Sequence, residues 1–327
     1  MTIVTDNRYP VATDVAPASF EAGIDARASD FFALLKPRVM SLVVFTGLVG
    51  LVLAPGSIHP IIGFTALLCI AVGAGASGAL NMWYDADIDA RMSRTLSRPI
   101  PSGRLTPDDA LAFGLVLSVA SVLSMGLLVN VLSAALLAFT ILFYVVVYTM
   151  YLKRRTPQNI VIGGLSGALP PVIGWAAVTG NTPLDAWILF AIIFFWTPPH
   201  FWALSLLAHS EYEKAGVPML PVTHGAKATR LQILLYSVVL VAVSLTPLLT
   251  GLGGWIYAIV TGLLNLVFLY YAVRVWRSHA GDADAGAADR KVARGMFLFS
   301  ILYLFLVFAA VLVEHAAGLH MPVGVFG

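Results

Sequence analysis

Charged residues are scarce in this chain. Lys and Arg contribute 19 of the 327 residues and Asp and Glu contribute 17, which is 11% of the sequence. Soluble globular proteins carry about 25% charged residues. Hydrophobic residues make up 59%, so a water-soluble two-domain enzyme of this length is excluded and lipid is the solvent for most of the chain.

Cysteine is almost absent. The single cysteine, Cys69, lies inside the apolar run TALLCIAV. A disulfide framework, a CxxC redox pair and a CxxCH haem attachment site are therefore excluded. The net charge of +2 is small and the basic residues form no single patch, so no nucleic-acid partner is expected.

Long apolar runs are abundant instead. A membrane-spanning helix needs about 20 mainly apolar residues, and the chain predicts an all-α integral membrane protein, a bundle of nine transmembrane helices. The predicted helices are 39–54, 60–80, 110–129, 132–152, 160–179, 184–207, 231–250, 254–273 and 295–313.

The basic residues predict the orientation of this bundle. All 19 Lys and Arg residues lie in alternate segments between the predicted helices, and the intervening segments hold none. By the positive-inside rule, the N-terminus is cytoplasmic and the C-terminus is outside, which agrees with an odd number of helices. The first segment is rich in acids, unlike a mitochondrial transit peptide, so we expect a bacterial inner membrane protein.

Three parts are expected along the chain. Residues 1–30 are a polar, disordered cytoplasmic lead, 31–315 form a single transmembrane domain, and 316–327 are a short periplasmic tail. Because the basic side carries the longer loops, chemistry is expected on the cytoplasmic face.

The most informative segment is NMWYDADIDARMSRTLSRPIPSGRL, residues 81–105. On a helix, Asn81, Asp85 and Asp89 form one stripe because they are spaced four residues apart, while Asp87 points elsewhere. An Asp at the bilayer centre costs about 2.5–3.5 kcal/mol, so the stripe must lie at a helix end beside water. Oxygen ligands of this kind hold Mg²⁺, which leaves positions for phosphate oxygens. We predict a metal site on these three residues.

Two arginines follow the acidic stripe. Arg94 and Arg98 are again four residues apart, and guanidinium groups bind phosphate oxygens with two parallel hydrogen bonds. Carboxylates for a metal beside guanidiniums for an anion predict a diphosphate site. The alternative is an interfacial acidic turn with arginines that only set the topology.

These motifs resemble those of a known family. The pattern N-x-x-x-D-x-x-x-D at the cytoplasmic end of the second helix is similar to that of the UbiA superfamily of intramembrane prenyltransferases, and within it to the haem-farnesylating group. The resemblance covers about residues 31–230 and rests on the blocks LKPRVMSLVVFTG, RTLSRPIPSGRL, YLKRRTPQNIVIGG, PPVIGWAAVTG, WTPPHFWALSL and AGVPMLPVTHG. The last three helices match only as apolar spans.

The resemblance implies a fold and a reaction. It implies a UbiA-type bundle with a central cavity open to the cytoplasmic face. It implies transfer of a farnesyl group from farnesyl diphosphate to a vinyl group of haem B, with addition of water, to give haem O for terminal oxidase biogenesis. Haem B is then a substrate, the divalent metal is Mg²⁺, and the product passes to a haem A synthase or to oxidase assembly factors. The catalytic candidates are Asn81, Asp85, Asp89, Arg94 and Arg98, because Mg²⁺ held by the first three and the guanidinium groups of the two arginines would neutralise the leaving diphosphate.

The second long loop, 208–230, departs from the superfamily pattern. A second D-x-x-x-D motif is missing, since Glu211 and Glu213 are its only acids and the fourth residue after Glu211 is Ala215. Glu211 is the candidate in this loop, and a second metal site built wholly from protein is not expected.

His200 is the candidate haem ligand, because histidine is a common axial ligand and the haem-farnesylating group places a histidine here. If the helix continues, His200 and Glu211 share one face. The alternative is a histidine that satisfies a backbone carbonyl freed by the kink at Pro198 and Pro199.

Further features have more than one interpretation or predict local structure only. One such feature is the basic group Lys153, Arg154 and Arg155. It has three interpretations: completion of the diphosphate site, pairing with haem propionates, or anchoring of the topology alone. The same three interpretations apply to Lys36 and Arg38. The small residues 73–78 allow close helix packing or admit a porphyrin. The pairs Pro170-Pro171 and Pro198-Pro199 predict broken helices.

Two other functions compete. A UbiA relative that prenylates an aromatic quinone precursor differs from the haem-farnesylating group only in the acceptor. A transporter, from a different class, would use broken helices as a substrate path, but it needs no metal-spaced acids followed by paired arginines on one face.

Overall fold

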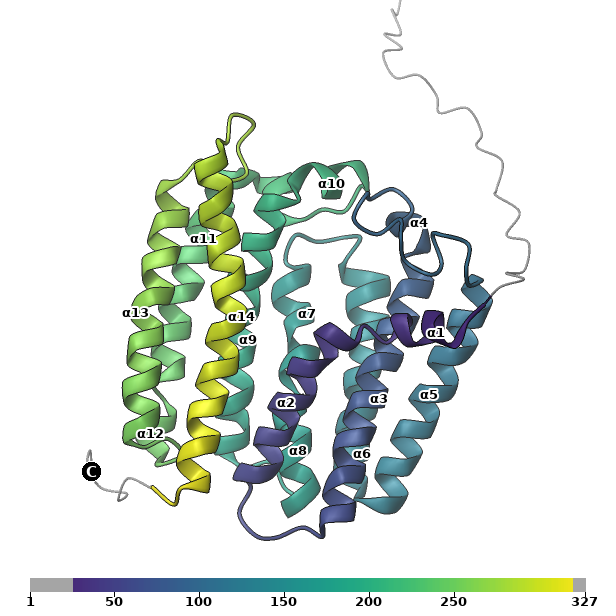
Figure 1. Ribbon diagram of the computed structural model, residues 1–327, viewed down its shortest axis with the longest axis vertical. Coiled ribbons are helices and arrows are strands. Elements are labelled where there is room, and N and C mark those ends of the chain that lie inside the picture. The colour runs from purple at the N-terminus through teal and green to yellow at the C-terminus, as the bar shows by residue number, and fades with distance from the viewer. Residues whose placement is uncertain (1–25, 320–327) are drawn as a thin grey trace, which may run out of the picture.

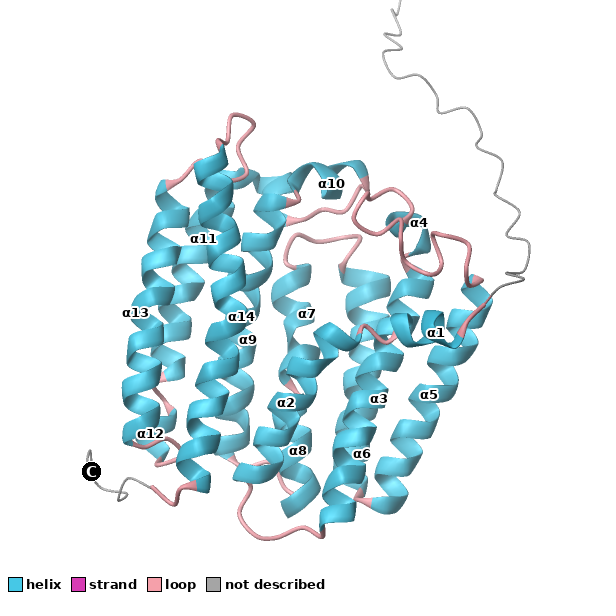
Figure 2. Cartoon of the chain, viewed as in Figure 1, coloured by secondary structure: helices cyan, strands magenta, loops and turns pink. Residues whose placement is uncertain are grey.

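The structure is a computed structural model that describes residues 26–319. The described residues form helices joined by turns, as Figure 2 shows, so the all-α prediction is confirmed. In chain order the helices are α1 Ala28–Leu34, α2 Pro37–Leu53, α3 Pro60–Tyr84, α4 Ala86–Asp89, α5 Pro107–Leu128, α6 Val131–Leu142, the π-helix η1 Phe143–Leu152, α7 Asn159–Ala168, α8 Pro170–Thr179, α9 Leu184–Leu207, α10 His209–Lys214, α11 Leu220–Ser244, α12 Pro247–Thr250, α13 Trp255–Arg277 and α14 Ala287–Ala316.

The helices are those of a multi-pass membrane protein. Within residues 26–319, eight helical segments are long and apolar enough to cross a membrane, and a ninth is obtained when α1 and α2 are counted as one bent span. The angle between those two helices is 54°. Alone, the 17 residues of α2 reach only about 26 Å at 1.5 Å per residue, which is short of the roughly 30 Å hydrocarbon core.

The observed helices extend beyond the predicted runs at the end that carries the long loops. α11 begins at Leu220 rather than 231, with non-helical backbone at Gly225 (φ 81°), and α14 begins at Ala287 rather than 295. Hydropathy ends a run where polar residues begin, whereas helical hydrogen bonding continues into water.

The N-terminal prediction needs one correction. Residues 28–30, which we expected in the disordered lead, form the first turn of α1. Asp30 is buried there because it accepts a hydrogen bond from Arg104 Nε at 2.7 Å. The remainder of the predicted lead, 1–25, and most of the predicted tail, 320–327, lie outside the described residues.

The long helices run side by side, and the two ends of the bundle differ (Figure 1). α3 packs against α5, α2 against α8, α9 against α11, and α13 against α14. At one end lie the connecting segments 85–106, 153–158, 208–219 and 278–286. Each of them carries charged residues, so we call this end the charged end. At the other end the connections are short, namely 54–59, 129–130, 180–183 and 251–254.

Small residues allow close helix packing. A Cβ on Gly174 of α8 would lie 2.1 Å from the carbonyl oxygen of Gly47 in α2, and one on Gly73 of α3 would lie 2.9 Å from Leu137 Cδ1 in α6. Real Cβ atoms never come so close to a backbone oxygen, so α2 and α8 require glycine at this contact. The close contact at Gly73 agrees with the close-packing interpretation of the run 73–78.

The two proline pairs behave differently. The helix breaks at Leu169, between α7 and α8, as the Pro170-Pro171 pair predicts. The predicted break at Pro198-Pro199 is wrong, because α9 continues through both prolines. Both prolines are buried, and α9 packs against α7, α11 and α14; such packing supports a proline-containing helix in a membrane. Thr197 Oγ1 also donates to the carbonyl of Ile193 at 2.8 Å.

Candidate active site

Asn81, Asp85 and Asp89 lie where α3 ends at the charged end (Figure 1). α3 stops at Tyr84, but the amide of Asp85 still bonds to Asn81 O at 3.0 Å and that of Asp89 to Asp85 O at 2.8 Å. The four-residue spacing of the stripe is thus preserved across the helix end. All three side chains are buried, with exposed fractions of 5%, 1% and 3%, and Asn81 Nδ2 donates to Asp85 Oδ2 at 2.7 Å.

Lys36 joins this group from the bend between α1 and α2. Its Nζ donates to Asn81 Oδ1 at 2.8 Å, and the charges of Asp85, Asp89, Arg98 and Lys153 all act on its ammonium group. The backbone of Lys36 adopts a left-handed conformation, φ 52°, which an L-residue adopts only at a cost. Of the three interpretations of Lys36, membership of the site therefore has a structural basis.

The π-helix η1 also contacts the stripe, through Thr149 and Lys153. Thr149 Oγ1 accepts from Asn81 Nδ2 at 3.2 Å and donates to Tyr144 O at 2.9 Å, five residues earlier. The amide of Lys153 also bonds five residues back, to Tyr148 O at 2.9 Å. The ammonium group of Lys153 then forms an ion pair with Asp85 Oδ2. Short π-helices are frequent at functional sites, and this one places Lys153 against the stripe.

The two arginines do not act as a pair. Arg98 Nη1 forms an ion pair with Asp89 Oδ2 at 2.5 Å. Arg94 is exposed and lies with its guanidinium carbon 6.0 Å from the ring centroid of Tyr212. Residues 91–103 are turns rather than helix, so the four-residue spacing of Arg94 and Arg98 does not place them on one face. The structure brings Arg98 to the carboxylates and leaves Arg94 outside the group.

Arg154 closes the group on the side of Asp87. Its guanidinium donates to Asp87 Oδ2 at 2.9 Å, to Asp87 Oδ1 at 2.7 Å and to Tyr84 O at 2.9 Å. Partial burial raises the pKa of Asp87, but the hydrogen bonds from Arg154 outweigh it, so the net pKa lies below its usual value. Asp87 is exposed by half and points away from the buried stripe.

One buried atom bears on whether the stripe can hold a metal ion. Asp85 Oδ1 is buried and accepts no hydrogen bond from any described residue, and Arg154 Nη2 lies 3.7 Å away from it. A buried carboxylate oxygen without a partner carries a large desolvation cost. One helical turn before and after Asp85, Asn81 and Asp89 carry oxygen atoms, which are hard ligands of the type that Mg²⁺ takes. The donor set therefore suits a divalent metal.

Glu211 lies beside the first loop rather than on the face of His200. α9 ends at Leu207 and α10 starts anew at His209, so the predicted shared face does not form. Glu211 Oε2 instead accepts from Ser93 N at 2.6 Å and from Ser93 Oγ at 2.9 Å. These hydrogen bonds hold the pKa of Glu211 below its usual value. Glu211 thus joins the two long loops at the charged end.

His200 lies within the bundle, on α9. Its ring is buried, stacks on Trp196 at 4.3 Å between centroids and on Phe297 at 4.9 Å, and its Nδ1 lies 2.6 Å from Ser300 Oγ. The alternative in which His200 satisfies a backbone carbonyl freed by the prolines is not what the structure has, since the partner of Nδ1 is a hydroxyl group on α14.

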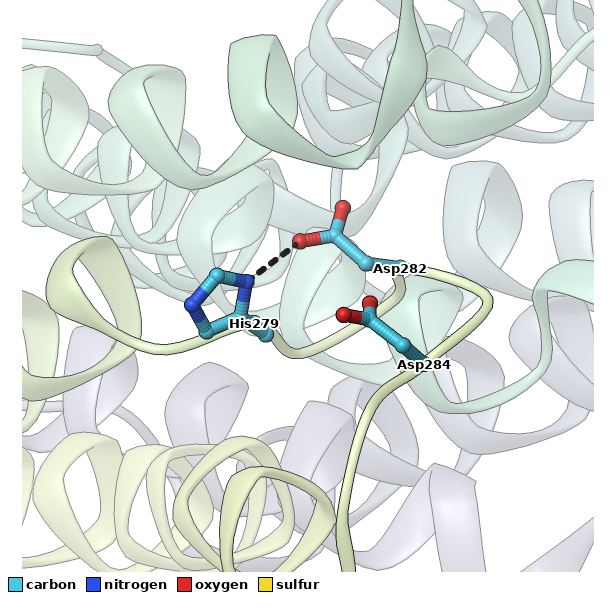
Figure 3. Close-up of side chains that lie close together, drawn as sticks. All are labelled: His279, Asp282 and Asp284. Atoms are coloured by element: carbon cyan, nitrogen blue, oxygen red, sulfur yellow. Dashed lines mark ion pairs between the residues drawn. The ribbon is translucent and has the colours of Figure 1, made fainter.

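A separate group of metal-type side chains lies in the connection between α13 and α14. His279, Asp282 and Asp284 present ligand atoms within 4.8 Å of one another (Figure 3). Asp282 is already paired with Arg230 at 2.9 Å and with His279 at 3.3 Å. His279 and Asp284 are exposed. This group lies across the charged end from α4 (Figure 1) and is an exposed ion-pair cluster of the loop rather than part of the buried stripe.

Comparison with known proteins places the chain in a family. The UbiA prenyltransferase family matches residues 43–301. The chain is 68% identical over 302 residues to the protoheme IX farnesyltransferase of Hyphomonas neptunium, covering 91% of this chain and 95% of that relative. It is 61% identical over 308 residues to the protoheme IX farnesyltransferase of Caulobacter vibrioides, covering 90% and 92%.

Solved structures share the fold at low identity. A digeranylgeranylglyceryl phosphate synthase superimposes with a TM-score of 0.70 at 18% identity, covering 87% of this chain and 97% of that chain. A UbiA homolog from Archaeoglobus fulgidus, bound to DMAPP and Mg²⁺, superimposes with a TM-score of 0.59 at 16% identity, covering 86% and 99%. The predicted UbiA-type bundle is thereby confirmed.

Proposed function

This chain belongs to the UbiA prenyltransferase family, and we propose that it transfers the farnesyl group of farnesyl diphosphate to a vinyl group of haem B, with addition of water, to give haem O. Its relatives at 61–68% identity bear the name protoheme IX farnesyltransferase. The observation that carries the proposal is the buried Asn81, Asp85 and Asp89 stripe, whose Asp85 Oδ1 lacks a hydrogen bond and whose surroundings are cationic.

The stripe is proposed to hold Mg²⁺ through Asn81, Asp85 and Asp89. When bound, the metal supplies a positive charge that stabilises the leaving diphosphate. In the structure, Arg98 and Lys153 form ion pairs with the carboxylates of the stripe. Lys36 donates a hydrogen bond to Asn81. We propose that these three side chains turn to the diphosphate oxygens, because the metal then neutralises the acids in their place. Arg154 has the same role at the edge of the site, and Arg94 reaches the diphosphate only if its loop moves.

The farnesyl chain and the haem require an environment without water. An allylic cation released from its diphosphate reacts with any nearby water, so the reaction needs an apolar chamber. The helices behind the stripe bury Leu80, Ile141, Ile160 and Trp196, among others. We propose that a cavity between them opens to the charged end, and that His200 contacts the haem. The vinyl carbon attacks the cation, so no protein nucleophile is needed.

The charged end is proposed to face the cytoplasm of a bacterium, with the protein in the inner membrane and its C-terminus periplasmic. All 19 Lys and Arg residues belong to segments that this orientation places in the cytoplasm. The diphosphate group of farnesyl diphosphate is charged, so it would reach the stripe from the cytoplasmic side. The product would pass to a haem A synthase or to terminal oxidase assembly factors.

A UbiA-type enzyme for an aromatic quinone precursor would use the same stripe. What favours haem as the acceptor is the identity of 68% over 302 residues to a protoheme IX farnesyltransferase, together with the buried His200, which an aromatic acid does not require.

The proposal is tested in a host that lacks haem O synthase. Expression of the wild-type chain should restore haem O in extracted membranes. Asp85→Asn should lower its formation at least about 100-fold, the usual loss when one group that stabilises transition-state charge is removed. The matched control is Asp87→Asn, which alters a neighbouring carboxylate that points away from the stripe and should retain most of the activity. Absence of haem O with the wild type, or equal activity of both variants, would refute the proposal.

Metal dependence provides a second test. Treatment of purified protein with EDTA should abolish farnesyl transfer, and added Mg²⁺ should restore it, because the carboxylate stripe alone repels the diphosphate. Haem O formation that persists at full rate in excess chelator would contradict the metal role of Asn81, Asp85 and Asp89.

A further inference from the structure

The ring of His200 is fixed from three sides. Trp196 and Phe297 cover its two faces, with interplanar angles of 16° and 23°. Ser300 of α14 binds its edge, with Oγ 2.6 Å from Nδ1. Trp196 Nε1 donates to the backbone carbonyl of Ser300 at 2.7 Å, so the turn of α14 that carries Ser300 is itself bonded to α9.

The direction of the hydrogen bond between His200 and Ser300 follows from a second contact. Ser300 Oγ lies 2.6 Å from the carbonyl oxygen of Phe297. A carbonyl cannot donate, and two oxygens at this separation require a hydrogen between them, so the single hydroxyl hydrogen of Ser300 points to Phe297. Toward His200 the hydroxyl can only accept. Nδ1 therefore carries the hydrogen, and Nε2 presents its lone pair.

Nε2 has the properties of a metal-ligating nitrogen. It accepts no hydrogen bond from residues 26–319, and no carboxylate in that range forms an ion pair with the ring. An imidazole that acts as a proton acceptor is usually oriented by a carboxylate that stabilises the imidazolium. A neutral hydroxyl on Nδ1 instead fixes the tautomer and the ring orientation, as outer partners of ligating histidines do.

We propose that Ser300 is a positioning residue for the acceptor substrate: it holds His200 in the Nδ1–H tautomer, so that Nε2 is directed as a ligand to the haem iron. This inference rests on the proposed function, and it gives a role to α14, a helix in which the sequence shows only an apolar span. Ser300 itself touches no reacting atom. Ser300 affects the affinity for haem B and the ligation state of the haem iron.

The test is spectroscopic and uses the full-length protein in detergent. Haem B is titrated into wild type, Ser300→Ala, Ser300→Thr and His200→Ala, and the absorption spectrum and Kd are recorded. Ser300→Ala should weaken haem affinity about 10- to 100-fold, the usual effect of losing an outer partner of a metal ligand, and should shift the Soret band toward that of His200→Ala. Ser300→Thr keeps the hydroxyl group and should restore the wild-type spectrum.

Ser237→Ala is the matched control. Ser237 is also buried and donates to a carbonyl of its own helix, Ile233 O at 2.6 Å, but it bonds to no histidine, so its spectrum should be that of wild type. A wild-type Soret band and Kd in a folded Ser300→Ala protein would overturn the role of Ser300. If the spectrum and Kd of His200→Ala differ from wild type in the same experiment, His200 would remain the ligand. If Ser300→Ala does not fold, a Ser300→Thr spectrum unlike that of wild type overturns it. Unchanged haem binding in His200→Ala would instead refute the haem contact on which the inference rests.

Discussion

Lys36 depends on partners that are distant in the chain. Its ammonium group reaches Asn81, 45 residues away, and lies within the fields of Asp85 and Asp89. Nothing in the sequence distinguishes it from Arg38, which stands two residues later and is exposed. Only the bend between α1 and α2 turns the first side chain to the site and the second away from it.

Replacement of Lys36 therefore has a defined effect. Lys36→Met should raise the KM for farnesyl diphosphate about 10- to 100-fold, because a hydrogen bond to a charged group contributes about 1.5–3 kcal/mol and each 1.4 kcal/mol is a factor of ten. Arg38→Met also removes one positive charge, from an exposed position, and should leave KM nearly unchanged. Steady-state kinetics with membranes measures both, and equal KM values for the two variants would remove Lys36 from the site.

The bond between Glu211 and Ser93 should make stability depend on pH. The pKa of Glu211 is lowered in the folded protein, so its stabilising contribution is present above the unfolded pKa of about 4.3 and is lost as the pH falls through the lower folded value. The midpoint of thermal unfolding of Glu211→Ala should therefore lie below that of wild type at neutral pH and should converge with it in acid.

Glu213→Ala is the control for this experiment, since Glu213 is exposed and lies in the same short helix, α10. A difference between Glu211→Ala and wild type that grows as the pH falls would contradict the linkage.

At the scale of elements, the sequence predicts well whatever depends on composition or local spacing. Segments that face lipid are apolar all round, so their length alone locates the helices. The stripe from Asn81 to Asp89 is local too, because four-residue spacing survives the end of α3. By contrast, Arg94 and Arg98 were placed by helical spacing in a segment that forms turns, and the partner of Glu211 is 118 residues distant.

The π-helix η1 is an element that the sequence does not reveal. Its ten residues, FYVVVYTMYL, read as an ordinary apolar run. Tyr148 packs where a Cβ on Gly163 would lie 2.2 Å from its ring, so tertiary contact with α7 accompanies the wider turn. Hydropathy cannot distinguish a π-helix from an α-helix, and Thr149 therefore carried no signal as a site residue.

The contact between α2 and α8 gives a prediction for one element pair. Gly174→Ala should destabilise the protein by about 1–3 kcal/mol, the usual cost of overpacking, because its Cβ would meet Gly47 O. Gly167→Ala, in the preceding helix, adds a Cβ with nothing within 4 Å and should leave stability equal or improved, since Ala favours helix over Gly. Thermal unfolding in detergent compares them, and an unfolding midpoint of Gly174→Ala equal to that of wild type would disprove the close approach.

The orientation of the whole molecule can be tested with its single cysteine. Cys69 is buried and should not react with a membrane-impermeant maleimide. Asn181→Cys, at the end with short connections, should react in intact spheroplasts, and Arg155→Cys, at the charged end, should react only after lysis. Both positions are exposed. The reverse labelling pattern would invert the proposed topology.

The unequal ends of the bundle also bear on how the protein is made. In the proposed orientation, the segments that must cross the bilayer during synthesis are the connections 54–59, 129–130, 180–183 and 251–254 and the C-terminal residues 317–327, and none contains a Lys or Arg. Transfer of charge through the hydrocarbon core is the main barrier to insertion. The insertion machinery therefore has little polar chain to translocate, and every residue of the proposed diphosphate site can fold on the side where the ribosome delivers it.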